Sequence, residues 1–156
     1  MKSSSVERQM GPIDVDFMMD RFVTACRERG FSVTPQRLAL YRALLGNRGH
    51  PTPEMLFAEV REQMPTLSLA TVYKAIDTFK EMDLIRELRV PEDHRMRLDA
   101  DMRRHHHLVC VRCREVMDLH LDLAGDLSFP PDSVSGFEVH SFTVQLSGVC
   151  SECKSD

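Results

Sequence analysis

Residues 52–80, TPEMLFAEVREQMPTLSLATVYKAIDTFK, contain two short helical patterns joined by one turn. Each pattern begins with a hydroxyl residue that can cap a helix, Thr52 and Ser68, and a proline follows the first of them. The residues Pro65-Thr66-Leu67 leave room for only a short turn between the two helices. This order predicts a helix-turn-helix, in which the second helix reads DNA.

Two further helices are expected before this motif, at residues 14–29 and 34–46, and a two-stranded hairpin after it, at residues 84–90 and 95–98. Short capped helices followed by a small hairpin are typical of a winged helix-turn-helix. A generic helix bundle with solvated polar faces is the alternative interpretation. The candidate DNA contacts are polar residues expected on the surface of the second and fourth helices: Gln36, Arg37, Ser68, Thr71, Tyr73, Lys74, Thr78 and Lys80.

The length of 156 residues predicts one domain, or two small domains that depend on each other. A hydrophobic fraction of 42% with 28% charged residues excludes a fully disordered chain and a fibrous protein. No stretch approaches the ~18–20 apolar residues that span a bilayer, and the N-terminus lacks an apolar signal segment, so a cytoplasmic protein is expected. Residues 1–13 are expected to form a flexible extension.

The charge of the chain is unevenly distributed. Residues 1–90 carry 13 basic and 12 acidic side chains, whereas residues 91–156 carry 7 basic and 12 acidic ones. This asymmetry suggests two sections with different partners, of which the amino-terminal one meets phosphate and the carboxy-terminal one holds cations.

Two Cys-x-x-Cys pairs, Cys110/Cys113 and Cys150/Cys153, lie in the carboxy-terminal half. Such a turn lets two thiolates bind one ion, and two such turns make a closed four-thiolate zinc site. The alternatives are two unrelated reduced pairs or one redox-active pair. The fifth cysteine, Cys26, lies on an apolar helical stripe and is expected in the core.

Three adjacent histidines, His105, His106 and His107, stand just before the first cysteine pair. If they enter a β-strand, His105 and His107 point to one side and His106 points to the other. Two imidazoles with the nearby carboxylates of Asp99 and Asp118 form a nitrogen and oxygen donor set that accommodates Fe(II), Mn(II) or Zn(II). The sequence therefore predicts two metal sites, one closed and structural and one exchangeable. The isolated histidines His94, His120 and His140 are expected to be surface or packing residues.

Five motifs together resemble the ferric uptake regulator family, in order and over residues 15 to 153: Thr34-Pro-Gln-Arg37, His50-Pro-Thr52, Ser68-Leu-Ala-Thr-Val-Tyr73, His105-His-His-x-x-Cys-x-x-Cys113 and Cys150-x-x-Cys153. The resemblance implies an α+β fold, with a winged-helix DNA-binding domain over residues 14–99 and an α/β dimerisation domain over residues 100–156. It further implies a homodimeric repressor that binds a double-stranded DNA operator and that acts neither as an enzyme nor on a small organic substrate. A four-cysteine zinc site would support the dimer, and a second metal would lock the DNA-binding arrangement.

The peroxide-responsive branch of this family is the one that the sequence most resembles. The regulatory ligands of that branch fall here on His50, Asp99, His105, His107 and Asp118, with Leu98 in place of an aromatic residue before the first aspartate. The iron-uptake branch commonly has glutamates at the two carboxylate positions. Sensing of peroxide through bound Fe(II) or Mn(II) is therefore expected, and sensing of iron, zinc or manganese is the alternative.

The ligand set suggests how such a sensor would work. One ion held by all five residues would join the two halves and set the recognition helices of a dimer about 34–36 Å apart, the spacing of successive major grooves. Peroxide would oxidise His50 or His105, which the resemblance indicates as the sensitive positions, and would thereby release metal and DNA. Oxidation of the zinc-bound thiolates is a competing hypothesis. A non-haem iron oxygenase and a zinc-dependent interaction module are further alternatives that the helix-turn-helix pattern disfavours.

Overall fold

The computed structural model describes residues 11–90, 93–120, 136–137, 140 and 142–155. The described residues divide into two compact units, a helical unit of residues 12–103 and a sheet unit that begins at Arg104. Residues 1–10 of the expected flexible extension lie outside the described ranges. Within those ranges, none of the helices combines the length and the apolarity that crossing a membrane requires.

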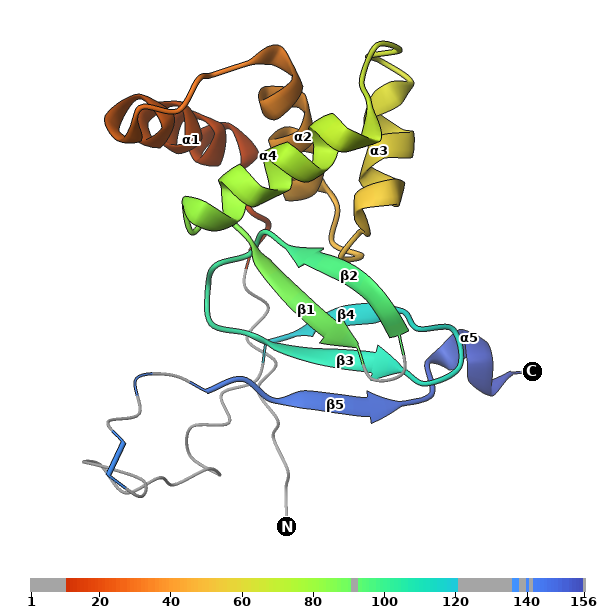
Figure 1. The fold of residues 1–156 in the computed structure, drawn as a ribbon. Helices are drawn as coiled ribbons and strands as arrows, with labels where there is room; N and C mark the ends of the chain where they lie inside the picture. The colour runs from red at the N-terminus through yellow and green to blue at the C-terminus, as the bar shows by residue number, and fades with distance from the viewer. Residues whose placement is uncertain (1–10, 91–92, 121–135, 138–139, 141, 156) are drawn as a thin grey trace. The chain divides into compact units, whose positions relative to one another are not determined.

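The helical unit contains four helices followed by a hairpin, α1 (Val15–Arg29), α2 (Pro35–Gly46), α3 (Pro53–Arg61), α4 (Leu69–Glu81), β1 (Arg86–Val90) and β2 (Asp93–Asp99) (Figure 1). A side-chain oxygen caps each helix by accepting a hydrogen bond from a backbone N–H three residues later, and the capping residues are Asp14, Thr34, Thr52 and Ser68. The strands β1 and β2 pair in antiparallel fashion. This order confirms the predicted winged helix-turn-helix.

Three aromatic rings form the centre of the helical unit's core. The ring centroid of Phe22 lies 4.8 Å from that of Tyr41 and 5.5 Å from that of Phe79. Cys26 is fully buried beside Met82, as the sequence predicted for it. The centre of this core therefore consists of aromatic side chains from α1, α2 and α4.

One expectation for the helical faces is wrong. Thr78, expected in solvent, is only 7% exposed, and its hydroxyl donates to the carbonyl oxygen of Lys74 and accepts a bond from Arg37. A threonine can face a core because its hydroxyl finds partners within its own helix.

The sheet unit is small. Its strands are β3 (His106–Cys110), β4 (Val116–Leu119) and β5 (Gln145–Gly148), in the order β4-β3-β5, with β4 antiparallel and β5 parallel to β3, and the short helix α5 (Ser151–Lys154) follows. The buried apolar side chains among its described residues are Val109, Cys110 and Val116. Among the described residues this core is small, and a bound metal would add stability to it. Helices with a hairpin followed by this unit confirm the predicted α+β class.

Candidate metal centres

The four cysteines of the two Cys-x-x-Cys pairs lie together in the sheet unit. Cys110 ends β3, Cys113 lies in the turn to β4, and Cys150 and Cys153 lie at the start and within α5. Their four sulfur atoms all lie within 4.8 Å of one another, and the Cys113 and Cys150 sulfurs are 3.8 Å apart. Ligands about 2.3 Å from a tetrahedral zinc ion lie about 3.8 Å from each other, so the cluster fits zinc. All four cysteines are free thiols rather than disulfides.

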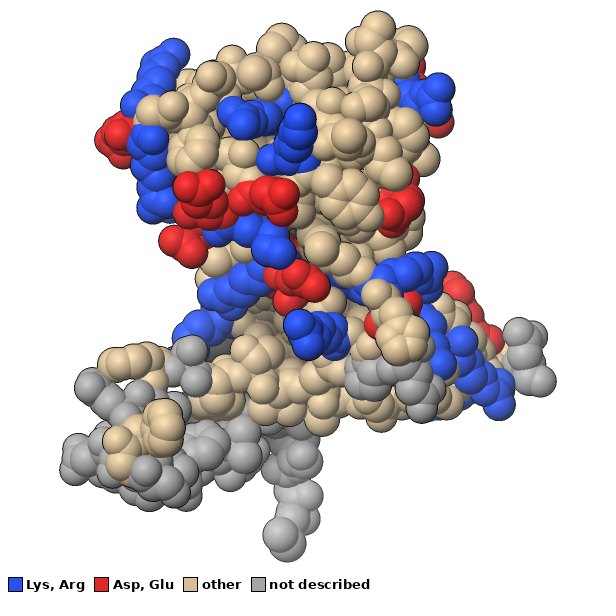
Figure 2. Space-filling view, viewed as in Figure 1, with Lys and Arg blue, Asp and Glu red and all other residues tan. Residues whose placement is uncertain are grey.

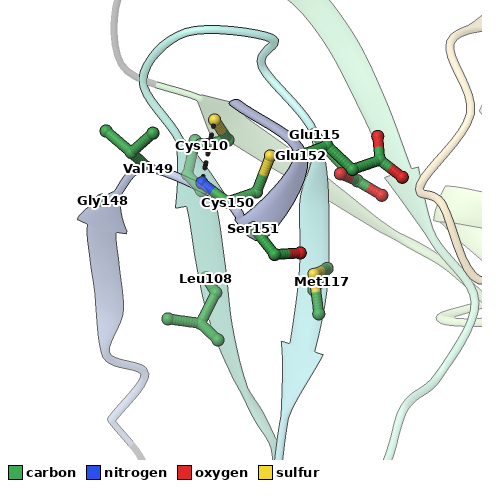
Figure 3. Close-up of a pocket in the computed structure, with 10 residues that line it drawn as sticks. Leu108, Cys110, Glu115, Met117, Gly148, Val149, Cys150, Ser151 and Glu152 are labelled. Carbon is green, nitrogen blue, oxygen red and sulfur yellow. Dashed lines mark hydrogen bonds between the residues drawn. The ribbon is translucent and has the colours of Figure 1, made fainter. Parts of the chain in front are cut away.

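The electrostatics of the cluster also favour a cation. The backbone N–H of Cys150 donates to the Cys110 sulfur over 3.4 Å (Figure 3), and this bond, with others from Cys113 and Arg112, lowers the pKa of the Cys110 thiol to about 6. The neighbouring Cys150 thiol raises the pKa of Cys153 to about 12. Neighbouring thiols are difficult to deprotonate together because the resulting thiolates repel each other. A bound divalent cation offsets this repulsion.

A cavity of about 300 Å³ adjoins the cysteine cluster (Figure 3). Leu108 on β3 pairs directly with Met117 on β4 and with Leu146 on β5, so these three apolar side chains form one row across the sheet. Met117 and Leu146 are exposed, at 48% and 43%. The row is an apolar face that one chain alone leaves in contact with water.

The other face of the same sheet carries nitrogen and oxygen donors. The Nε2 atoms of His105 and His107 are 3.0 Å apart, and an Asp118 carboxylate oxygen lies 3.4 Å from the first and 3.8 Å from the second. Donors at right angles around an ion, each about 2.1 Å from it, lie about 3 Å apart, so this group fits a divalent ion. His106 points to the opposite face, where its Nδ1 accepts a hydrogen bond from the Val144 backbone, and this confirms the predicted alternation.

The helical unit holds the two remaining predicted ligands, His50 and Asp99. The Nδ1 atom of His50 lies 4.0 Å from an Asp99 carboxylate oxygen, and both side chains are buried. His50 has a left-handed backbone with a φ of 49°, and its carbonyl oxygen accepts a bond from the Arg97 guanidinium. Three of the five predicted ligands thus belong to the sheet unit and two to the helical unit.

One histidine of the sheet unit was not predicted from the sequence to bind metal. His120, expected to be a surface or packing residue, directly follows β4, and its ring centroid lies 5.7 Å from that of His105. The signal in the sequence is the spacing Asp118-x-His120, because alternate residues of a strand share a face.

The predicted DNA contacts differ in their exposure and in the hydrogen bonds of their side chains. Lys74 on α4 and the capping residue Ser68 are exposed, and the Ser68 hydroxyl lies 2.8 Å from that of Thr71. Tyr73, also exposed, donates to a Glu54 carboxylate oxygen over 2.6 Å. On the face shown in Figure 2, basic and acidic side chains are interspersed over the helical unit. Gln36 is half-buried at the start of α2.

Arg37 is a predicted DNA contact whose side chain also has hydrogen-bond partners within the helical unit. Its guanidinium donates to the Ser32 carbonyl oxygen and to the Thr78 hydroxyl, so it joins α2 to α4.

Both the sequence and the fold of this chain resemble those of known proteins. The sequence profile of the ferric uptake regulator family matches residues 28–147. The chain is 28% identical over 142 residues to the peroxide-responsive repressor PerR of Staphylococcus epidermidis, which covers 91% of this chain and 94% of the relative. Similar solved structures include the Helicobacter pylori ferric uptake regulator Fur, which has three functional metal-binding sites (TM-score 0.74, 16% identity, 93% of this chain and 97% of that one). Another is a zinc uptake regulator complexed with zinc and DNA (TM-score 0.58, 21% identity, 91% and 96%). At these identities the two structures show the fold alone.

Proposed function

Because this chain belongs to the ferric uptake regulator family, we propose that it is a repressor that senses peroxide through a regulatory Fe(II) or Mn(II) site. The observation that carries the proposal is the group of His105, His107 and Asp118, a nitrogen and oxygen donor set separate from the four thiolates. Thiolates select zinc, whereas imidazole with carboxylate accommodates iron and manganese. The aspartates at positions 99 and 118 and the likeness to a peroxide-responsive repressor favour peroxide over iron as the signal.

The two metals have different tasks. Zinc bound by Cys110, Cys113, Cys150 and Cys153 closes the turn after β3 onto α5 and supplies the stability that the small core of the sheet unit lacks. The regulatory ion takes ligands from both units, His50 and Asp99 from one and His105, His107 and Asp118 from the other. Its occupancy then shifts the chain toward the arrangement that binds DNA.

The DNA-binding surface is that of a winged helix. The α4 helix enters the major groove, with Lys74 on a phosphate and with Ser68, Thr71 and Tyr73 at phosphates and base edges. Gln36 lies at the start of α2 as a further contact. Arg37 is a further proposed phosphate contact beside Gln36, and its bonds to Ser32 and Thr78 also hold α4 in place.

The chain acts as a homodimer through its sheet unit. The exposed apolar row of Leu108, Met117 and Leu146 is the kind of surface that a second copy covers. The domains that serve these two tasks are residues 14–99 for DNA and 100–156 for metal and dimerisation.

Sensing depends on a ligand that peroxide destroys. Fe(II) held by these ligands would activate peroxide next to the imidazoles. The ring of His50 or His105 would then take up one oxygen atom of the peroxide, and the other oxygen atom would leave as water. An oxidised ring is a poorer ligand, so the metal affinity falls and the population of the DNA-binding arrangement falls with it.

A peroxide pulse on the Fe(II)-loaded protein tests this proposal, with the Mn(II)-loaded protein as control. Mass spectrometry of the digested protein is expected to show one added oxygen on the peptide of His50 or His105 in the iron form alone, together with release of DNA in an anisotropy assay. A Cys110–Cys113 disulfide with intact histidines would make the zinc site the sensor. Release of DNA by an iron chelator but not by peroxide would make the chain an iron sensor.

A further inference from the structure

The register between β3 and β4 extends one step beyond the paired ladder. His107 lies opposite Asp118 and His106 lies opposite Leu119, so the next pair in the same register is His105 and His120. Alternate residues of a strand share a face, and the face of His105 and His107 is therefore also that of Asp118 and His120. The end of the two strands carries four metal-binding side chains in a two-by-two array.

The contacts agree with this register. The His120 ring centroid lies 5.7 Å from that of His105, and a ring nitrogen of His120 lies within 4.8 Å of a carboxylate oxygen of Asp118. The Nδ1 atom of His120 is buried and has no hydrogen-bond partner within the described part of the chain. A buried imidazole nitrogen without a partner costs free energy that a bound cation would recover.

We infer that His120 is a ligand of the regulatory ion, so that the sheet unit alone offers a complete set of three imidazoles and one carboxylate. This inference rests on the proposed function, because it concerns the same ion. The four donors are His105, His107, His120 and Asp118, and all come from two adjacent strands of one unit.

A ligand set within one unit implies an order in which the two units bind the ion. The sheet unit captures the ion first, and His50 and Asp99 then join it from the helical unit. Loss of the His50 imidazole weakens the attachment of the DNA-binding unit while the ion stays on the sheet. The role of His50 is then to couple metal to DNA rather than to retain the metal.

The test uses the full chain with its zinc in place and follows Mn(II) binding by the electron paramagnetic resonance signal of the free ion. His120→Gln is expected to weaken Mn(II) binding about tenfold or more, since even supporting residues of metal sites contribute about 10–100-fold. Pulsed resonance of the bound ion is expected to show one coupled imidazole nitrogen fewer. His120→Asp restores most of the affinity, because a carboxylate also suits Mn(II). His94→Gln, an exposed histidine on β2, is the matched control and binds like the wild type.

A second pair of variants tests whether the sheet unit suffices. His50→Ala is expected to keep Mn(II) binding with reduced affinity, and His50→Ala with His120→Gln is expected to lose it. Zinc content, expected to be unchanged in every variant, shows that the sheet unit is folded.

The inference would be overturned if His120→Gln bound Mn(II) as tightly as His94→Gln does. It would also be overturned if His120→Asp lost as much affinity as His120→Gln while both variants retained zinc. A third contrary result would be the loss of all Mn(II) binding in His50→Ala. A wild-type chain that binds zinc but no further divalent ion would instead overturn the proposed function itself.

Discussion

The guanidinium of Arg37 donates hydrogen bonds to the Thr78 hydroxyl over 3.1 Å and to the Ser32 carbonyl oxygen over 2.7 Å. The first bond joins α2 to α4, and its two residues are 41 positions apart in the sequence. The Thr78 hydroxyl is buried and also donates to the carbonyl oxygen of Lys74. Arg37 thus fixes the position of the helix that is proposed to read DNA.

Removal of this link is expected to destabilise the helical unit. Arg37→Met keeps the side-chain stem but loses both bonds, and hydrogen bonds to charged groups contribute about 1.5–3 kcal/mol each when buried. Because Arg37 is only partly buried, we expect a loss of about 1–2 kcal/mol in the free energy of unfolding. Urea unfolding followed by tyrosine fluorescence measures it, since the chain has no tryptophan and both tyrosines, Tyr41 and Tyr73, lie in the helical unit.

Arg42→Met is the matched control for this measurement. Arg42 pairs with Asp16 on the surface, and exposed ion pairs contribute about 0–1 kcal/mol. Equal losses in the two variants would show that the Arg37 bonds add nothing beyond an exposed ion pair.

Lys74 is expected to act on DNA and not on stability. Its side chain is exposed on α4, so Lys74→Ala should leave the urea midpoint unchanged. If its ammonium neutralises one phosphate, the slope of log affinity against log salt concentration falls by about 0.9. Anisotropy with random-sequence duplex DNA, in the presence of Mn(II), measures the slope. Lys154→Ala in α5 is the control, and a slope change as large in this variant would contradict the assignment.

Acid should weaken the hairpin through Asp93. Hydrogen bonds from Arg95, with the charges of Arg95 and Arg97, hold the pKa of the Asp93 carboxyl well below its ordinary value of 3.8. The unfolded chain therefore binds this proton at a higher pH than the folded chain does, and stability falls as the pH drops below about 4. Asp93→Asn lacks this contribution. The difference in unfolding free energy between wild type and Asp93→Asn should be full near pH 7 and should shrink below about pH 4. A difference that stays constant down to pH 3 would show that the ion pairs do not lower this pKa.

Local signals in the sequence predicted much of the fold. The caps Thr34, Thr52 and Ser68 each bond to the backbone three residues on, so the start of a helix depends on residues within one turn of it. The cysteine spacing likewise predicted a cluster whose sulfurs lie within 4.8 Å of one another.

What the sequence did not reveal depends on partners far along the chain. The buried Thr78 hydroxyl accepts a bond from Arg37 on α2, and nothing near residue 78 indicates that partner. His120 was not predicted to bind metal, because only the register of β3 and β4 identifies His105 as its neighbour. An isolated histidine carries no sign of which strand lies beside it.

Removal of zinc is expected to unfold the sheet unit and leave the helical unit folded. The aromatic core of Phe22, Tyr41 and Phe79 lies wholly in the helical unit, whereas the described part of the sheet unit buries few apolar side chains. Since the four thiolates join the turn after β3 to α5, chelation or Cys153→Ser removes the main stabilising contact of the sheet. Hydrogen exchange should show loss of protection in β3, β4 and β5 and little change in α1 to α4. The urea transition seen by tyrosine fluorescence should shift little, and the chain should become monomeric in sedimentation. Loss of protection in both units together would mean that the helical unit depends on the sheet unit for its fold, and its aromatic core would then be insufficient by itself.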